Sequence, residues 1–243
     1  MIGRIKQIVK KILPGFKVES PKDKFAALYE KSYSQSGEDL IINFIFSFIG
    51  IENVSYLDIG ANEPIKYNNT YKFHKICKNG VLVEPNPLLK SELQKFRPND
   101  KLLEIGLGDK EISSVQFYIL KPHTLSTFDE KTAEKYINEE GAELIETKEI
   151  KITTLDNLIE TEFGKAPSFI SIDAEGYDFK ILKGLKIKKF FPKVFCIETL
   201  TYSKNGDQFK RNDIIDYVKK MGYYNYADTY INTIFVRNDL IGK

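Results

Sequence analysis

The sequence has few cysteines, no long hydrophobic run and almost no net charge. Its two cysteines, Cys77 and Cys196, lie far apart without metal-ligand spacing, which argues against a disulfide framework or a zinc site and favours a reducing compartment. No stretch of about 18 apolar residues occurs, so we expect no membrane-spanning helix. The formal net charge of +2 argues against a protein that coats nucleic acid.

What the sequence does contain is enough apolar material for one substantial core. Hydrophobic residues make up 42 % of the 243 residues, and one domain with elaborations is the simplest organisation.

Residues 1–15 form a basic amphipathic pattern. Apolar residues recur at helical spacing and basic residues lie between them: Ile2, Ile5, Ile8, Val9, Ile12 and Leu13, with Arg4, Lys6, Lys10 and Lys11. The apolar run is too interrupted for a secretory signal. We expect residues 1–32 to form an amphipathic helix and a linker, with the helix lying on a membrane surface; a helix packed on the domain or on a partner is the alternative. The expected location is cytoplasmic, with peripheral contact to the inner face of the membrane.

The rest of the chain, residues 33–243, alternates predicted strands with predicted helices. The predicted helices are residues 25–33, 38–48, 70–77, 87–96, 154–159, 177–182 and 212–221. The predicted strands are residues 54–59, 81–83, 102–105, 115–120, 148–153, 169–172, 194–197, 223–226 and 233–236. This alternation predicts an α/β fold with a mostly parallel sheet covered on both faces, ending in an antiparallel pair. Residues 121–147 are polar and predict an insertion or lid over one end of the sheet.

Four predicted strands end at or run into a carboxylate. The acids are Asp58, Glu84, Asp173 and Glu198. Ligands of open parallel sheets bind outside the carboxyl ends of the strands, so these acids predict a ligand site there. For each acid alone, a helix cap or a pair with a lysine is the alternative.

The turn after Asp58 indicates what kind of ligand this is. Gly60 and Ala61 allow a tight turn and a close approach to a ligand. The three-glycine turn G-x-G-x-x-G is lacking, so nothing here demands a phosphate. Glu84 follows the next predicted strand, where a carboxylate can accept both hydroxyls of a ribose. The sequence therefore predicts a nucleoside ligand.

Seven short motifs occur in an order that resembles a known family. They read SQSGEDLI, DIGAN, NNT, VEPNP, GLGD, TLDNLI and IDAEGYD, across roughly residues 33–199. Together they resemble the FkbM family of S-adenosylmethionine-dependent methyltransferases. The chain departs from the common Gly-Ala-Asn-x-Gly continuation with Glu63 and Pro64, and resembles a subset with proline here and Asn-Thr soon after, matched by Asn69 and Thr70. The resemblance implies a Rossmann-like class I methyltransferase fold, with a mostly parallel seven-stranded sheet, helices on both faces and an antiparallel C-terminal strand.

The resemblance also implies roles for individual residues toward S-adenosylmethionine. The methionine end of the cofactor would contact Asp58, Gly60 and Asn62. The ribose hydroxyls would bind Glu84, in a turn shaped by Pro85 and Asn86. The adenine would be bordered by Gly106, Leu107 and Asp109. The upstream motif, expected to close over the cofactor or the acceptor, contributes Gln35, Glu38 and Asp39; ordinary helix capping is the alternative for these three residues.

Methyl transfer requires an aligned acceptor and removal of a proton. Asp173 is the first candidate base, with Glu175 and Glu198 orienting the acceptor. In the alternative, Asp173 and Glu198 hold Mg²⁺, which would bind and acidify a sugar diol. His123 is a further candidate base, although a lone loop histidine is more often merely exposed.

The acceptor is predicted from the resemblance alone. FkbM relatives act on hydroxyls of polyketides, sugars and glycolipids, which implies an O-methyltransferase with a sugar in a surface glycan or glycolipid as its expected acceptor. A lipid-linked glycan would suit the basic N-terminal pattern. Two alternatives stay open: an oxidoreductase with a nucleoside cofactor, and a non-catalytic module that binds S-adenosylmethionine. We expect no nucleic-acid partner.

Overall fold

A computed structural model describes residues 30–77, 80–186, 190–202 and 206–241. The chain divides into two units, residues 1–31 and residues 32–243, and every element below belongs to the second. The helix predicted at the N-terminus and most of the one predicted over residues 25–33 lie outside the described residues.

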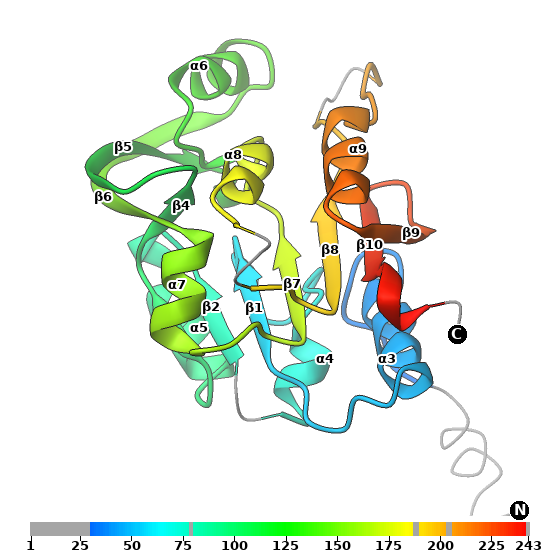
Figure 1. Cartoon of the computed structure of the whole chain (residues 1–243). Coiled ribbons are helices and arrows are strands. Elements are labelled where there is room, and N and C mark those ends of the chain that lie inside the picture. The colour runs from blue at the N-terminus through cyan, green and yellow to red at the C-terminus, as the bar shows by residue number, and fades with distance from the viewer. Residues whose placement is uncertain (1–29, 78–79, 187–189, 203–205, 242–243) are drawn as a thin grey trace, which may run out of the picture. The chain divides into compact units, whose positions relative to one another are not determined.

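Seven strands form the main sheet (Figure 1). In spatial order they are β3 (Lys101–Leu103), β2 (Gly80–Val83), β1 (Tyr56–Ile59), β7 (Phe169–Ile172), β8 (Val194–Glu198), β10 (Asn232–Arg237) and β9 (Tyr223–Asp228). The first five strands are parallel, whereas β10 runs antiparallel to both of its neighbours. This confirms the predicted fold class, a Rossmann-like α/β fold with a mostly parallel seven-stranded sheet.

Helices cover both faces of the sheet. One face packs against α7 (Leu155–Glu162), α8 (Asp178–Lys183) and α9 (Asn212–Lys220). The other packs against α3 (Glu38–Phe48), α4 (Tyr71–His74) and α5 (Lys90–Phe96), which follows the short helix η1 (Pro87–Leu89). Strand β1 serves both cores because alternate side chains point to opposite faces: Leu57 belongs to the first core and Tyr56 to the second.

A second, three-stranded sheet has the order β4 (Gly106–Gly108), β6 (Glu143–Thr154) and β5 (Ile112–Lys121). The strands predicted over residues 115–120 and 148–153 lie within β5 and β6. Residues 121–147, predicted as an insertion or lid, run from the end of β5 into β6 and contain η2 (His123–Leu125) and α6 (Glu130–Asn138). Leu120, Leu125 and Tyr136 belong to a small core of their own under this connection.

Several local details differ from the predictions, among them β4, a strand that the sequence did not predict. The helix predicted over residues 70–77 is shorter, because only Tyr71–His74 is helical. The chain closes with a short helix, η3 (Asn238–Leu240). Across the described ranges, no helix has the length and apolar character that a bilayer crossing requires.

Candidate active site

A cavity of about 460 Å³ lies at the carboxyl ends of the parallel strands. Its size falls in the range of small-ligand sites. The lining includes Glu84 just after β2, Asp58 in β1, Asp173 just after β7 and Glu198 at the end of β8. Because these four strands are neighbours in the order β2-β1-β7-β8, the sheet brings the four acids into one cavity.

The loop after β1 is packed against the end of β7. Gly60 has a φ of 79°, and a Cβ at this position would lie 1.8 Å from the backbone oxygen of Asp173. Its N–H donates to the carbonyl of Val83 at 3.0 Å. The glycine is therefore required by the close approach of two backbone segments as well as by its positive φ.

Glu84 is held by backbone N–H groups of two loops, the one after β1 and the one after β2. The N–H of Asn62 donates to Oε2 at 2.9 Å, and the N–H of Asn86 donates to Oε1 at 2.8 Å. The residue is 5 % exposed, and burial raises the pKa of the carboxyl group from its usual 4.5 to about 7, although both backbone N–H groups act in the opposite direction. A carboxylate has about four acceptor sites, so two remain for hydroxyl donors in the cavity.

Asp58 is fixed through one of its oxygens. Asn68 Nδ2 and Thr70 Oγ1 donate to Oδ2 at 3.1 and 2.6 Å, and Arg97 Nη1 lies 3.9 Å from the same atom. Burial raises the pKa of the Asp58 carboxyl group, and the positive charge of Arg97 opposes that shift. The NNT motif therefore acts locally, by orienting the acid of β1.

Arg97 ties this acid to a second layer of polar groups. It is 1 % exposed, and its Nε donates to Asp100 Oδ2 at 2.6 Å. Tyr56 Oη donates to the other oxygen of Asp100 at 2.7 Å, and His74 Nδ1 lies 3.1 Å from Oδ2. Sequence reasoning did not single out Arg97, because a basic residue just after a helix resembles an ordinary exposed end.

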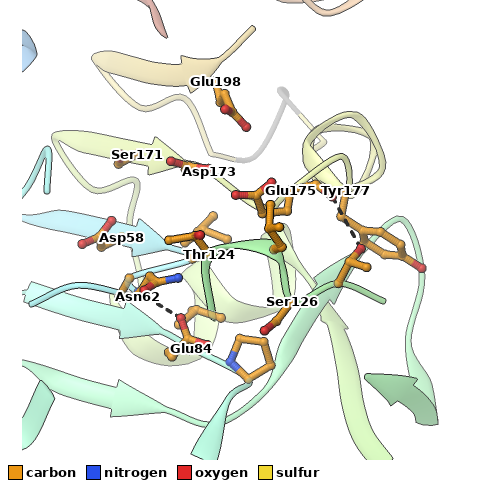
Figure 2. Close-up of a pocket in the computed structure, with 18 of the residues that line it drawn as sticks. Asp58, Asn62, Glu84, Thr124, Ser126, Ser171, Asp173, Glu175, Tyr177 and Glu198 are labelled. Atoms are coloured by element: carbon orange, nitrogen blue, oxygen red, sulfur yellow. Dashed lines mark hydrogen bonds between the residues drawn. The ribbon is translucent and has the colours of Figure 1, made fainter. Parts of the chain in front are cut away.

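Three acids face each other on the far side of the cavity from Glu84. Figure 2 shows Asp173, Glu175 and Glu198 on that side, with Thr124 between them and the pair formed by Glu84 and Asn62. Burial, followed by the charge of Asp178, raises the pKa of Asp173 to about 7. Burial and the charge of Asp173 also raise the pKa of Glu175 and that of Glu198.

The loop after β7 that carries Glu175 is itself well ordered. Asp178 accepts the N–H of Ala174 at 2.9 Å and that of Gly176 at 3.1 Å. Glu175 has a φ of 46°, in the left-handed region that side-chain-bearing residues rarely occupy. Thr127 Oγ1, from the connection between β5 and β6, donates to the backbone carbonyl of Glu175 at 3.5 Å. Residues 121–147 thus support the acid side of the cavity.

One wall of the cavity is apolar. It includes Leu107 from β4, Phe117 from β5 and Phe128 from the loop after η2. Gly106 lies beneath the Phe128 ring, where a Cβ would come within 2.5 Å of Phe128 Cζ. An apolar wall with aromatic rings suits the adenine ring of a nucleoside.

Most of the predicted site residues line the cavity. The lining includes Gln35, Asp58, Gly60, Asn62, Glu84, Pro85, Gly106, Leu107, His123, Asp173, Glu175 and Glu198. Sequence reasoning missed Thr124, Ser126 and Ser171, which also line it and which no motif singled out.

Four predicted residues do not line the cavity. Glu38 is fully buried, and its Oε1 accepts from Thr229 Oγ1 at 2.6 Å and from Asn232 Nδ2 at 3.0 Å. Asp39 accepts the N–H of Tyr33 at 2.8 Å. Neither acid caps α3 in the ordinary way, because the N-cap residue of this helix is Gly37 and it has no side-chain cap hydrogen bond.

The other two lie next to the cavity and outside it. Asn86 holds Glu84 through its N–H and caps η1 by accepting the N–H of Leu88 at 3.0 Å. Its Nδ2 also lies 3.4 Å from Nδ1 of His123. Asp109 is exposed to solvent.

The predicted Mg²⁺ site would have few protein ligands. Within the described ranges, no cluster of three or more histidine, cysteine, aspartate or glutamate side chains is arranged to hold a metal ion. Asp173 and Glu198, the two predicted Mg²⁺ ligands, both line the cavity.

Several solved methyltransferases are similar in structure to this chain. A TehB-like SAM-dependent methyltransferase from Corynebacterium glutamicum is 10 % identical, with a TM-score of 0.40 over 88 % of this chain and 92 % of that one. An S-adenosylmethionine-dependent methyltransferase from Clostridium acetobutylicum is 13 % identical, with a TM-score of 0.40 over 90 % and 99 %. An O-methyltransferase from Bacillus cereus, in complex with SAH, is 11 % identical, with a TM-score of 0.39 over 96 % and 97 %.

Comparison at the level of sequence identifies the family of the chain. No curated protein sequence matches it. A family model for the methyltransferase FkbM domain, however, matches residues 58–224. Since that match covers more than half of the chain, this protein belongs to the FkbM family of methyltransferases.

Proposed function

We propose that this protein is an O-methyltransferase that uses S-adenosylmethionine to methylate a hydroxyl group of a sugar, in a surface glycan or glycolipid. The observation that carries the proposal is the arrangement of the cavity. A buried carboxylate suited to a ribose, Glu84, lies on one side, and the acids Asp173 and Glu198 lie on the other (Figure 2).

The residues present fit the cofactor. Glu84 keeps free acceptor sites toward the cavity for ribose hydroxyls, and its orientation is fixed by the N–H groups of Asn62 and Asn86. The apolar wall with Leu107 and Phe128 suits the adenine. Asp58 offers a negative charge near the loop of Gly60, where the amino group of the methionine end would bind. When bound, S-adenosylmethionine supplies an electrophilic methyl group.

Asp173 is the base in this proposal. A hydroxyl that accepts a methyl group must lose its proton, and a base works best when its pKa lies near the operating pH. Burial and neighbouring charges raise the pKa of Asp173 to about 7, which meets that condition. Glu198 lines the same cavity and would orient the acceptor together with Glu175.

His123 and Mg²⁺ are the alternatives on the acceptor side. His123 lines the cavity beside Asn86, the residue whose N–H holds the ribose acid Glu84. Burial and the neighbouring acids raise the pKa of both Asp173 and Glu198, which favours the base over the metal-ligand role, since Mg²⁺ would require both groups ionised. Chelation by EDTA, followed by addition of Mg²⁺, separates the two roles in the same protein.

The cofactor part is tested by titration calorimetry with S-adenosylhomocysteine and, separately, with NAD. We expect S-adenosylhomocysteine to bind and NAD not to bind. Glu84→Ala should weaken that binding at least about 100-fold, because two charge-assisted hydrogen bonds of about 1.5–3 kcal/mol each are lost. Tight binding of NAD alone would favour the oxidoreductase alternative instead.

The acceptor part is tested on cells. Mass spectrometry of surface glycans with and without the gene should show the loss of one methyl group on a sugar. A protein that binds S-adenosylhomocysteine while all glycans stay unchanged would support the alternative of a non-catalytic binding module, or of an acceptor that is not a glycan.

A further inference from the structure

The wall of the cavity is rich in acids and poor in bases. Six acids line it: Asp58, Glu63, Glu84, Asp173, Glu175 and Glu198. Within residues 30–77, 80–186, 190–202 and 206–241, neither a lysine nor an arginine lines it, and His123 is the lining histidine.

Three cations of the described ranges stand behind the wall. Arg97 is buried next to Asp58 and partly offsets that one charge. Lys66 Nζ lies 4.3 Å from the ring centroid of Tyr67, and Lys180 Nζ lies 4.2 Å from that of Tyr177. Both tyrosines line the cavity, but the two lysines do not.

This wall is unfavourable for an anion for two separate reasons. An anionic group that leaves water needs a cationic partner, and the wall provides none among the described side chains. The ionised acids would also repel it at short range in a medium of low dielectric constant. Protonation of some of these acids weakens the repulsion, but it does not supply the missing cationic partner. S-adenosylmethionine carries a net positive charge and is compatible with the same wall.

Backbone strain at three lining residues marks the cavity wall as a built surface. Asn62, Tyr67 and Glu175 have φ values of 35°, 57° and 46°, and all three line the cavity. Left-handed backbone at residues with side chains is unfavourable and concentrates at functional sites. It holds the carboxylate of Glu175 and the half-exposed ring of Tyr67, which is 56 % exposed, at the cavity wall.

We infer that this cavity selects its acceptor by charge: it admits an uncharged polyhydroxyl group and excludes one that carries phosphate or carboxylate beside the reacting hydroxyl. The inference rests on the proposed function, since it concerns the acceptor of that same site. It narrows the acceptor to neutral sugars and excludes sugar phosphates and uronic acids at the methylated residue.

The test measures the potential inside the cavity and needs no knowledge of the acceptor. Thr124→Cys places a thiol of nearly the same size at the wall between the two groups of acids (Figure 2). Tyr202→Cys places a second one at the wall from the loop after β8. The control is Thr147→Cys, an exposed position on β6 outside the cavity, flanked by the oppositely charged Glu146 and Lys148. All variants carry Cys77→Ser to remove the half-buried native thiol.

Each thiol is treated at about pH 8 with a cationic and an anionic methanethiosulfonate reagent of similar size, and adducts are followed by intact mass spectrometry. The ratio of the two rates cancels the reactivity of the thiol itself. We expect the cationic-to-anionic ratio at positions 124 and 202 to exceed that at position 147 by about tenfold or more. Glu84→Gln in the Thr124→Cys background should lower the ratio.

Equal ratios at the cavity and control positions would overturn the inference. Either reporter suffices if the other variant does not fold. Titration of wild-type protein with S-adenosylhomocysteine is a separate measurement, so a failure of the proposed cofactor is distinguished from a failure of charge selection.

Discussion

We expect ionisation of Glu84 to lower the free energy of unfolding above neutral pH and, at the same time, to strengthen cofactor binding. Its pKa is raised by burial from 4.5 to about 7 in the folded protein. A raised folded pKa means that stability is greatest below the unfolded pKa and is lost as the pH rises through the folded value. At about 1.4 kcal/mol per pKa unit, the full loss is about 3 kcal/mol. The part of this loss of stability that occurs between about pH 5.5 and about pH 8 is about 2 kcal/mol.

Glu84→Gln removes this titration. The amide also gives up one acceptor for the N–H groups of Asn62 and Asn86, but that loss does not depend on pH. The unfolding free energy of wild-type protein relative to the variant should therefore fall by about 2 kcal/mol from about pH 5.5 to about pH 8. At about pH 8, the variant should bind S-adenosylhomocysteine about 10–100-fold more weakly than wild-type protein does, because a charge-assisted hydrogen bond to the ribose becomes a neutral one.

Urea unfolding followed by far-ultraviolet circular dichroism measures the first quantity, since the chain has no tryptophan. Glu92→Gln, an exposed position on α5, is the matched control and should show no pH-dependent difference. Parallel pH profiles for wild-type protein and Glu84→Gln would refute the raised pKa. Unchanged affinity in a folded variant would refute the ribose contact.

Three further predictions concern the base, the buried network and the N-terminus. Asp173→Asn should lower turnover by about 10²–10⁴-fold with S-adenosylhomocysteine affinity nearly unchanged; wild-type-like methylation of surface glycans in cells that express the variant would remove Asp173 from the mechanism. Arg97→Met should lower the unfolding free energy by about 3–5 kcal/mol, because buried Asp58 and Asp100 lose their partner; the exposed Lys95→Met should stay within about 0.5 kcal/mol of wild type, and a similar small effect for Arg97→Met would contradict the network. Deletion of residues 1–15 should release the protein from anionic liposomes without changing cofactor affinity, and high salt should mimic it. Full-length protein that never sediments with such liposomes would rule out this membrane contact.

The sheet and its acid-lined edge could be predicted from local sequence. Short apolar runs that end at Asp58, Glu84, Asp173 and Glu198 are signals contained within a few residues, and the rule for parallel sheets places such ends together. Strand order did not have to be known for the prediction that these acids share a site, because all carboxyl ends of parallel strands meet at one edge.

The partners of buried charges could not be predicted in the same way. Glu38 follows a glycine at the start of a helix and resembles an ordinary first-turn acid, yet its carboxylate binds Thr229 and Asn232, from the far end of the chain. Arg97 likewise lies next to Asp58 only because the fold brings them together, since the two residues are far apart in the sequence. Long-range pairs of this kind leave no periodic trace in a single sequence.

The contact between Gly60 and the backbone of Asp173 has a consequence for engineering. Because no side chain fits between these segments, the backbone path of the loop that would hold the cofactor constrains that of the residue proposed as base. A new acceptor preference cannot be installed by exchanging the β7 loop alone; the β1 loop has to be transplanted with it. A designer would therefore treat the two loops as one cassette and leave acceptor choice to the connection between β5 and β6, where α6 and Thr124 lie.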